Sequence, residues 1–256
     1  MNFFFGIKSD NLDSKLTIPR FQNSLRKNKK CNLYQLKIIN QSWEINHLSE
    51  VESLGDFYNI ESTLIENNSI YCLATNEETQ KLNNINSPRL IDFNDFTNTS
   101  PSYRANLQVF IKGGGFSSYQ SEYPFSMATK KGSILSPLSS LLNKEADKNI
   151  LFLKNIYEFP IEEEFRVFFV NIRTKQILKK EIVVTNFLNE ISIDQKFIEP
   201  DIFLFTDKYI GIPIFCSIQN NHISLEHTHP PHEYIMNENK FKVISKLKKE
   251  FSEIIS

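Results

Sequence analysis

The sequence predicts an α+β protein whose mixed, largely antiparallel sheet is built from hairpins, with a C-terminal amphipathic helix packed on it. Three observations support this class. Short apolar runs alternate with polar turns along the chain, without the long intervening helices that a parallel sheet requires. Two pairs of runs are joined by turns of two residues, Arg173-Thr174 and Asn220-Asn221. The longest helical pattern lies at the C-terminus.

Composition sets limits on the class of protein and on its partners. The chain has 256 residues, of which 40% are hydrophobic and 22 are phenylalanine, so it can form a substantial core. A net charge of −1 gives no general attraction to nucleic acid or to acidic lipid. We expect a small-molecule or carbohydrate-like substrate, because the segment after the three glycines is rich in hydroxyl and aromatic side chains. The apolar N-terminal run, Phe3–Phe5, is too short for a signal sequence or a membrane span. Three widely separated cysteines predict reduced thiols in a cytoplasmic protein; the sequence indicates no oligomeric state.

The first hundred residues contain mostly short elements. Apolar runs predict strands at Phe3–Ile7, Leu33–Ile39, Ile70–Ala74 and Leu90–Phe93. Helical spacing predicts short helices at Phe21–Lys30, Leu48–Leu54 and Glu77–Ile85. The polar segment Asn94–Ser102 suggests a boundary between an N-terminal α/β subdomain (1–100) and a C-terminal α+β subdomain (101–256), with one continuous domain as the alternative.

Three of the seven glycines follow the next predicted strand, Leu107–Lys112. Gly113, Gly114 and Gly115 permit either a tight hairpin turn or close approach of the backbone to a ligand. In the second reading the loop binds a phosphate or a sugar. Its substrate-binding residues would then be the three glycines with Lys112, Ser117 and Tyr119.

The remaining elements continue the pattern of strands. Ser136-Pro137 predicts the start of a helix that ends near Asn143, because serine caps helices and proline favours the first helical position. Apolar runs predict further strands at Ile150–Leu153, Phe165–Ile172, Lys175–Val184, Ile202–Phe205, Ile212–Gln219 and Ile223–His229. The last helix, Glu238–Ile254, has a predicted buried stripe of Phe241, Ile244, Leu247, Phe251 and Ile254.

Arg166 lies on a largely apolar face of the strand Phe165–Ile172, which is apolar on both faces and so reads as a central strand. An unpaired arginine is costly to bury there. We therefore expect either an acidic partner or an anionic substrate for it.

Four of the five histidines fall within the eleven residues His222–His232, together with two glutamates close by. Strand alternation places His227 and His229 on the same face as Ile223 and Leu225. The predicted catalytic residues are therefore His227, His229 and Glu226. The predicted ligands of a divalent metal (Zn, Fe or Mn) are His227, His229, His232 and Glu233. A metal-free site with one histidine as general acid or base, or a purely structural role, are the alternatives.

The spacing His227-x-His229-x3-Glu233 resembles the first half of the cupin metal motif. A cupin needs further strands and another histidine downstream, whereas only 23 residues follow Glu233 and they read as helix. The resemblance therefore illustrates a ligand geometry and does not assign the cupin fold.

Residues Val109–Pro231 are similar in part to the ATP-grasp ligases. The matching motifs are the strand, lysine and glycines of Phe110–Gly115, the E-x-R-x-F pattern of Glu164–Phe168, and a last hairpin carrying Glu226–Pro231. The resemblance implies an ATP-dependent ligase. The chain departs from the family at Thr228, where the family has a metal-binding asparagine, and it has no acidic residue in Ile212–Ile218.

Together these observations predict an enzyme with a histidine and carboxylate active site. It would perform hydrolysis or group transfer on a polar substrate containing a sugar or a phosphate, with or without a metal. An ATP-grasp-like ligase and a non-catalytic binding or assembly protein are the two alternatives.

Overall fold

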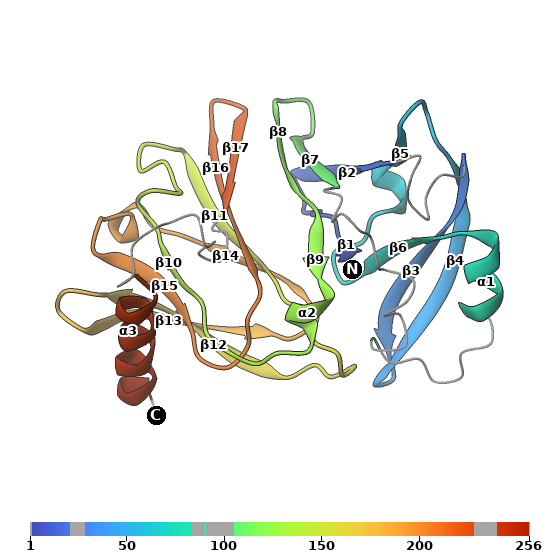
Figure 1. Ribbon diagram of the computed structural model, residues 1–256. Coiled ribbons are helices and arrows are strands. Elements are labelled where there is room, and N and C mark those ends of the chain that lie inside the picture. The colour runs from blue at the N-terminus through green and yellow to red at the C-terminus, as the bar shows by residue number, and fades with distance from the viewer. Residues whose placement is uncertain (1, 21–28, 83–89, 91–104, 228–239, 256) are drawn as a thin grey trace.

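A computed structural model describes residues 2–20, 29–82, 90, 105–227 and 240–255. In these ranges the protein is mostly antiparallel sheet with a C-terminal helix, as the sequence predicts at this level of detail (Figure 1). Four sheets are present, and every strand pairing in the described residues is antiparallel.

Two sheets come mainly from the first half of the chain. The first has the strand order β4 (Ser42–Glu52), β3 (Lys30–Ile39), β6 (Ile70–Ala74), β1 (Asn2–Phe4) and β9 (Glu122–Pro124). The second has the order β5 (Phe57–Ile60), β2 (Leu12–Pro19), β7 (Asn106–Ile111) and β8 (Phe116–Gln120). A 3-10 turn, η1 (Ser62–Leu64), and two helices, α1 (Asn76–Leu82) and α2 (Phe125–Ala128), accompany them.

The second half forms the other two sheets. One has the order β10 (Leu135–Pro137), β15 (Ile202–Thr206), β12 (Glu164–Asn171) and β13 (Gln176–Val184). The other has the order β14 (Leu188–Ser192), β11 (Lys148–Lys154), β16 (Ile212–Gln219) and β17 (His222–His227). A second 3-10 turn, η3 (Gln195–Phe197), precedes β15, and α3 (Lys240–Ile255) is the C-terminal helix.

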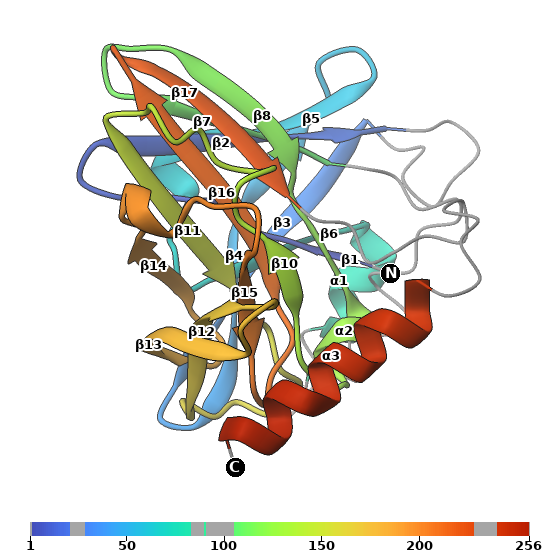
Figure 2. The same ribbon diagram turned by 90° about the vertical axis from the view of Figure 1, so that its left-hand side faces the viewer.

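The two halves have the same strand topology. The first contains the orders β4-β3-β6-β1 and β5-β2-β7-β8, and the second contains β13-β12-β15-β10 and β14-β11-β16-β17. Counted along the chain, the eight strands β1–β8 and the eight strands β10–β17 occupy matching places, and η1 and η3 each lie between the fifth and sixth strand. An eight-stranded unit therefore occurs twice. Figures 1 and 2 show hairpins β7–β8 and β16–β17, the last of each unit, side by side.

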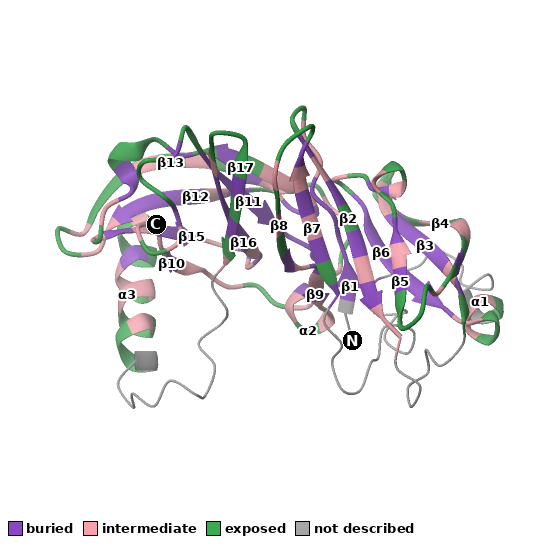
Figure 3. Ribbon diagram, turned by 90° about the horizontal axis from the view of Figure 1, so that it is seen from above, coloured by how far each residue is buried: buried purple, intermediate pink, exposed green. Residues whose placement is uncertain are grey.

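The two units share part of their core. One buried cluster lies within the second unit and includes Leu153, Phe169 and Phe215. A larger cluster fills the first unit and also includes Phe152 and Leu225 of the second. Figure 3 shows these buried residues concentrated on the strands of both units. The boundary predicted at residue 100 falls outside the described residues, so it stays a prediction.

Two predicted helices are wrong. Leu48–Leu54 belongs largely to β4, which pairs with β3 from Ser42 to Glu52, so long-range pairing overrides a local helical spacing. Ser136-Pro137 lies in β10, which pairs with β15, although the dipeptide is a good helix start. The helix predicted at Glu77–Ile85 is confirmed as far as Leu82, where the described part of α1 ends. The predicted elements Phe21–Lys30 and Leu90–Phe93 fall mostly outside the described residues.

The helix α3 contacts the second unit through one side. Phe251 is buried, and its ring lies 5.8 Å from that of Phe205. Lys248 donates to the Ser133 carbonyl at 2.5 Å. The predicted stripe is wrong at Ile254, which is 47% exposed, because Ile255 takes the inward position. The side chain of Phe241 lies outside the described part of the structure. No helix in the described ranges has the length and apolar character to cross a membrane.

Candidate functional site at the junction of β8 and β17

The hairpin β16–β17 positions His227, the first of the two histidines predicted to lie on one face of the strand. Its turn residues Asn220 and Asn221 have φ of 48° and 63°, the positive values that a two-residue hairpin turn requires. The resulting register pairs His227 with Ile214. Ile223 and Leu225 are buried, so the predicted alternation is confirmed as far as His227, which is partly buried on the same face. His229, His232 and Glu233 lie outside the described residues.

Strand β8 runs along β17 and contacts it at three levels. Gly115 N–H donates to the Asn221 carbonyl at 2.8 Å, and Leu225 N–H donates to Ser117 Oγ at 3.2 Å. At the far end the Tyr119 and His227 rings are perpendicular, with centroids 4.5 Å apart. The structure therefore brings two predicted substrate-binding residues, Ser117 and Tyr119, to the predicted catalytic histidine.

The phenol of Tyr119 is shielded from solvent at this junction. Only 8% of the residue is exposed, and burial, followed by the negative charge of Glu122, raises the pKa of its phenol. The Glu122 carboxylate accepts the Ala105 N–H. Tyr119 can therefore donate a hydrogen bond but cannot supply a phenolate near neutral pH.

The three glycines lie at the opposite end of the junction. Gly113 has a φ of 80°, and a Cβ on Gly114 would lie 2.9 Å from the Asn221 carbonyl oxygen. The glycines thus let two hairpins pack closely. Lys112 donates to the Asp10 carbonyl at 3.0 Å. A ligand-binding role for this turn stays a prediction.

The glycine turn and His222 lie far from His227 along the junction. His222 lies at the glycine end, with its Nδ1 3.5 Å from a Cβ built on Gly115. His227 lies five residue steps along the strand from His222, which is roughly 16 Å at about 3.3 Å per step. His222 and the glycines therefore cannot share a small site with His227. Glu226 is exposed and points to the face opposite His227.

Arg166 lies in β12, in a different sheet. Its Nε is 2.6 Å from Asp207 Oδ2, and its main-chain N–H donates to Asp207 Oδ1 at 3.0 Å. The guanidinium also lies 5.4 Å from the centre of the Phe168 ring. The expected acidic partner of Arg166 is therefore Asp207, and a contact with an anionic substrate stays a prediction. The glycine turn and the E-x-R motif of the ATP-grasp resemblance consequently belong to separate sheets.

One unusual group was not predicted. Lys154, at the end of β11, is completely buried, and its Nζ donates to the carbonyls of Asn67 at 2.9 Å and Ser69 at 3.3 Å. Burial lowers the pKa of Lys154 to about 7. No acidic side chain pairs with it among the described residues. Its partners lie 85 and 87 residues away, so no local sequence pattern could have identified it.

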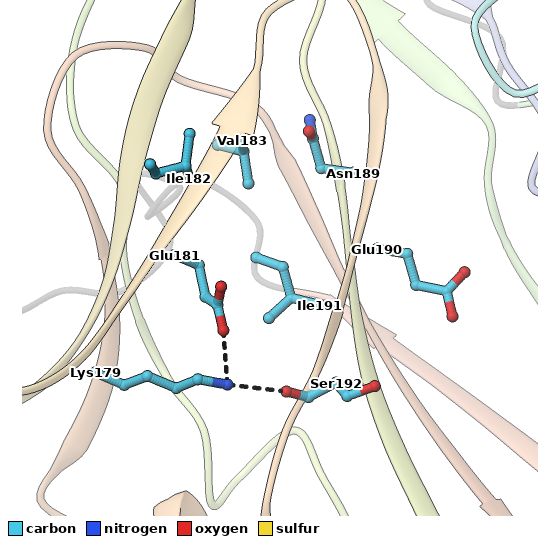
Figure 4. Close-up of a pocket in the computed structure, with 8 residues that line it drawn as sticks. All are labelled: Lys179, Glu181, Ile182, Val183, Asn189, Glu190, Ile191 and Ser192. Carbon is cyan, nitrogen blue, oxygen red and sulfur yellow. Dashed lines mark hydrogen bonds and ion pairs between the residues drawn. The ribbon is translucent and has the colours of Figure 1, made fainter.

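A shallow hollow lies between β13 and β14 (Figure 4). Lys179, at its rim, is 2.7 Å from Glu181 and donates to the Ser192 carbonyl at 3.5 Å. None of the predicted site residues lines it.

The metal-ligand prediction remains open. The described part of the chain contains no cluster of three or more His, Cys, Asp or Glu side chains arranged to hold a metal ion, and three of the four predicted ligands lie beyond that part. No protein-family model matches the chain, and neither a curated protein nor a solved structure matches it.

Proposed function

We propose that this protein is an enzyme whose active site lies where β17 ends, beside β8. One observation carries the proposal: His227 sits partly buried on the core side of β17, against the ring of Tyr119. A histidine in such a position is only half shielded from solvent and can bind a ligand or transfer a proton. The sequence adds two more histidines and a carboxylate within the next six residues, His229, His232 and Glu233.

The chemistry proposed for this site is hydrolysis or group transfer on a small polar substrate. Imidazole and carboxylate groups at this spacing can bind a divalent metal, which would activate a water molecule or polarise the substrate. Zinc, iron and manganese all accept such ligands. Without a metal, His227 would act as the general base, with Glu233, six residues later in the sequence, to orient it.

The test is metal content and affinity in single variants. Purified wild-type protein, His227→Ala and His229→Ala are loaded with Zn²⁺, dialysed and measured by elemental analysis. His47→Ala is the matched control, because His47 is exposed and bonds to Asn32, away from this junction. We expect about one metal per wild-type and control chain and strong loss in the other two variants. Equal metal content in all four proteins would contradict the metal-dependent form of the proposal.

The alternative of a non-catalytic assembly protein receives some support from exposed apolar side chains. Leu54, Phe116 and Ile182 are each more than half exposed. Leu54 lies in the turn before β5 and Phe116 on β8, at the two opposite edges of one sheet, and Ile182 lies on β13 in another sheet. Scattered exposed apolar residues are common and do not form one contact surface. The histidine site is therefore the stronger proposal.

A further inference from the structure

Exposed apolar side chains gather on β13 and α3, so Ile182 is not isolated there. Of the ten large apolar side chains that are exposed in the described residues, five lie on these two elements. The most exposed of the five are Ile182 at 59%, Val243 at 53% and Ile254 at 47%. A surface helix normally turns its apolar residues toward the core, so apolar side chains left outside in one place indicate a contact surface.

The two elements meet on the outer face of one sheet. Phe168 and Val170 of β12 belong to the buried cluster under α3. They pair with Lys180 and Ile177 of β13. Paired residues of neighbouring strands share a face, and alternation along β13 adds Ile182 to that face. This part of β13 therefore lies on the side of the sheet that α3 covers.

One line along α3 is turned toward β13. Val243, Glu250 and Ile254 are seven and four residues apart, a spacing that puts them on one line of a helix. The Glu250 carboxylate accepts a hydrogen bond from Lys175 Nζ at 2.5 Å, in the turn that leads into β13. Val243 and Ile254 therefore lie on the flank of α3 nearest β13. We call the apolar side chains of this flank and of the adjacent strand the α3–β13 surface: Val243, Ile254, Ile177 and Ile182.

Lysines surround the α3–β13 surface. The helix α3 carries five lysines and two glutamates, whereas the whole chain has a net charge of −1. The side chains of Lys246 and Lys249 are 80% and 79% exposed. Their ion pairs with glutamates four residues later are 3.9 Å long, and exposed pairs of this kind are weak. Lys180 is exposed on β13 between Ile177 and Ile182. This surface thus combines aliphatic side chains with a local excess of positive charge.

We propose that the α3–β13 surface binds the anionic face of a lipid bilayer, with α3 lying on the membrane and not crossing it. Aliphatic side chains of an amphipathic helix enter the headgroup boundary, and the lysines beside them attract acidic lipids. Val243 and Ile254 are roughly 17 Å apart at about 1.5 Å per residue, a spread that suits a planar partner. A second copy of the chain fits less well, because it would bring five more lysines against the first five. The proposal is independent of the histidine site, since none of its residues lies on β8 or β17.

The test is sedimentation of the full-length protein with lipid vesicles. Vesicles of phosphatidylcholine alone are compared with vesicles in which roughly one third of the lipid is phosphatidylserine. We expect roughly tenfold or greater preference for the acidic vesicles. High salt should remove that preference, because salt screens exposed charges.

Two double variants separate the apolar from the charged contribution. Val243→Ser with Ile254→Ser should weaken binding to the acidic vesicles about tenfold, because both side chains lose their contact with the headgroup boundary. Lys242→Gln with Lys246→Gln should weaken it roughly twenty-fivefold, at about fivefold for each lysine. All four residues are exposed, so neither double variant disturbs the core.

Leu54→Ser and Lys15→Gln are the matched controls, because both residues are exposed in the first unit, away from α3. Both should bind the vesicles as the wild type does. Absence of binding to acidic vesicles, equal binding to both kinds of vesicle, or equal binding by all variants would each overturn the proposal. A dimer without lipid that Val243→Ser with Ile254→Ser dissociates would assign the surface to a second copy instead. Binding of poly-glutamate without binding of vesicles would assign it to an acidic polypeptide.

Discussion

Replacing Lys154 with methionine should remove one specific pH dependence from the stability of the protein. In the folded state burial lowers the pKa of Lys154 to about 7, whereas the unfolded chain has the ordinary value of 10.5. Between these two values the unfolded state binds more protons at this residue than the folded state. The free energy of unfolding therefore rises with pH from about 7 to 10.5, and below about pH 7 the full cost of burying the charge applies.

The size of this effect follows from the pKa difference. At about 1.4 kcal/mol per pH unit, the interval from pH 7 to 9 corresponds to roughly 3 kcal/mol of added stability. Lys154→Met also loses the hydrogen bonds to the carbonyls of Asn67 and Ser69, which costs roughly 1–3 kcal/mol for each carbonyl left unsatisfied. That loss is the same at every pH, so the slope of stability against pH isolates the titration.

The assay is urea unfolding at half-unit steps from pH 6 to 9. Trp43, the single tryptophan, is 3% exposed and reports on unfolding by fluorescence. Lys148→Met is the control, because Lys148 lies on the same strand with a side chain that is 49% exposed. Wild type and Lys148→Met should gain stability in parallel, while Lys154→Met should not share the gain. Parallel curves for wild type and Lys154→Met would refute the reasoning.

Three further predictions concern packing, thiol chemistry and nucleotide binding. Gly114→Ala should lower the free energy of unfolding by about 1–3 kcal/mol, because its Cβ would meet the Asn221 carbonyl oxygen at 2.9 Å. Gly132→Ala should cost less, because its Cβ would meet only the Cγ2 methyl of Ile210 at 3.1 Å. Equal losses for the two variants in urea titrations would contradict this account. Burial raises the pKa of Cys216 to about 12, and all three cysteines are buried and outside any disulfide. A thiol reagent at pH 8 should therefore label the native protein far more slowly than the urea-unfolded chain, and rapid native labelling would argue against this burial. Mg-ATP at millimolar concentration should leave the thermal midpoint unchanged; a clear rise would favour the ATP-grasp alternative instead.

The sequence predicted strands well where their apolar residues are continuous. Ile70–Ala74 is β6 without change, and Phe165–Ile172 becomes β12, an interior strand between β15 and β13. Strand β2 was missed although it alternates, because one of its buried positions is Ser14, whose hydroxyl accepts the Ile7 N–H at 2.9 Å. A buried serine interrupts the apolar pattern when its hydrogen-bond partner is not known.

Other features depend on partners that no local pattern reveals. Strand β4 carries Glu44, Glu50 and Glu52 because it lies at the edge of its sheet, so its sequence is too polar to read as a strand. For the candidate site, alternation correctly placed His227 on the face of Leu225. It could not show that the neighbour would be Tyr119, which is 108 positions earlier in the chain.

Because the eight-stranded unit occurs twice, residues at matching positions of the two units can be compared directly. At matching places on β2 and β11, the first unit has Ile18 next to Leu16 on its inward face and the second has Lys154 next to Phe152. An apolar residue thus occupies in one unit the place that a charged residue occupies in the other. Once a structural module exists in two copies, one can go on meeting the demands of packing while the other becomes free to acquire chemistry. Exchanging residues between matching places would reveal which differences belong to architecture and which to activity.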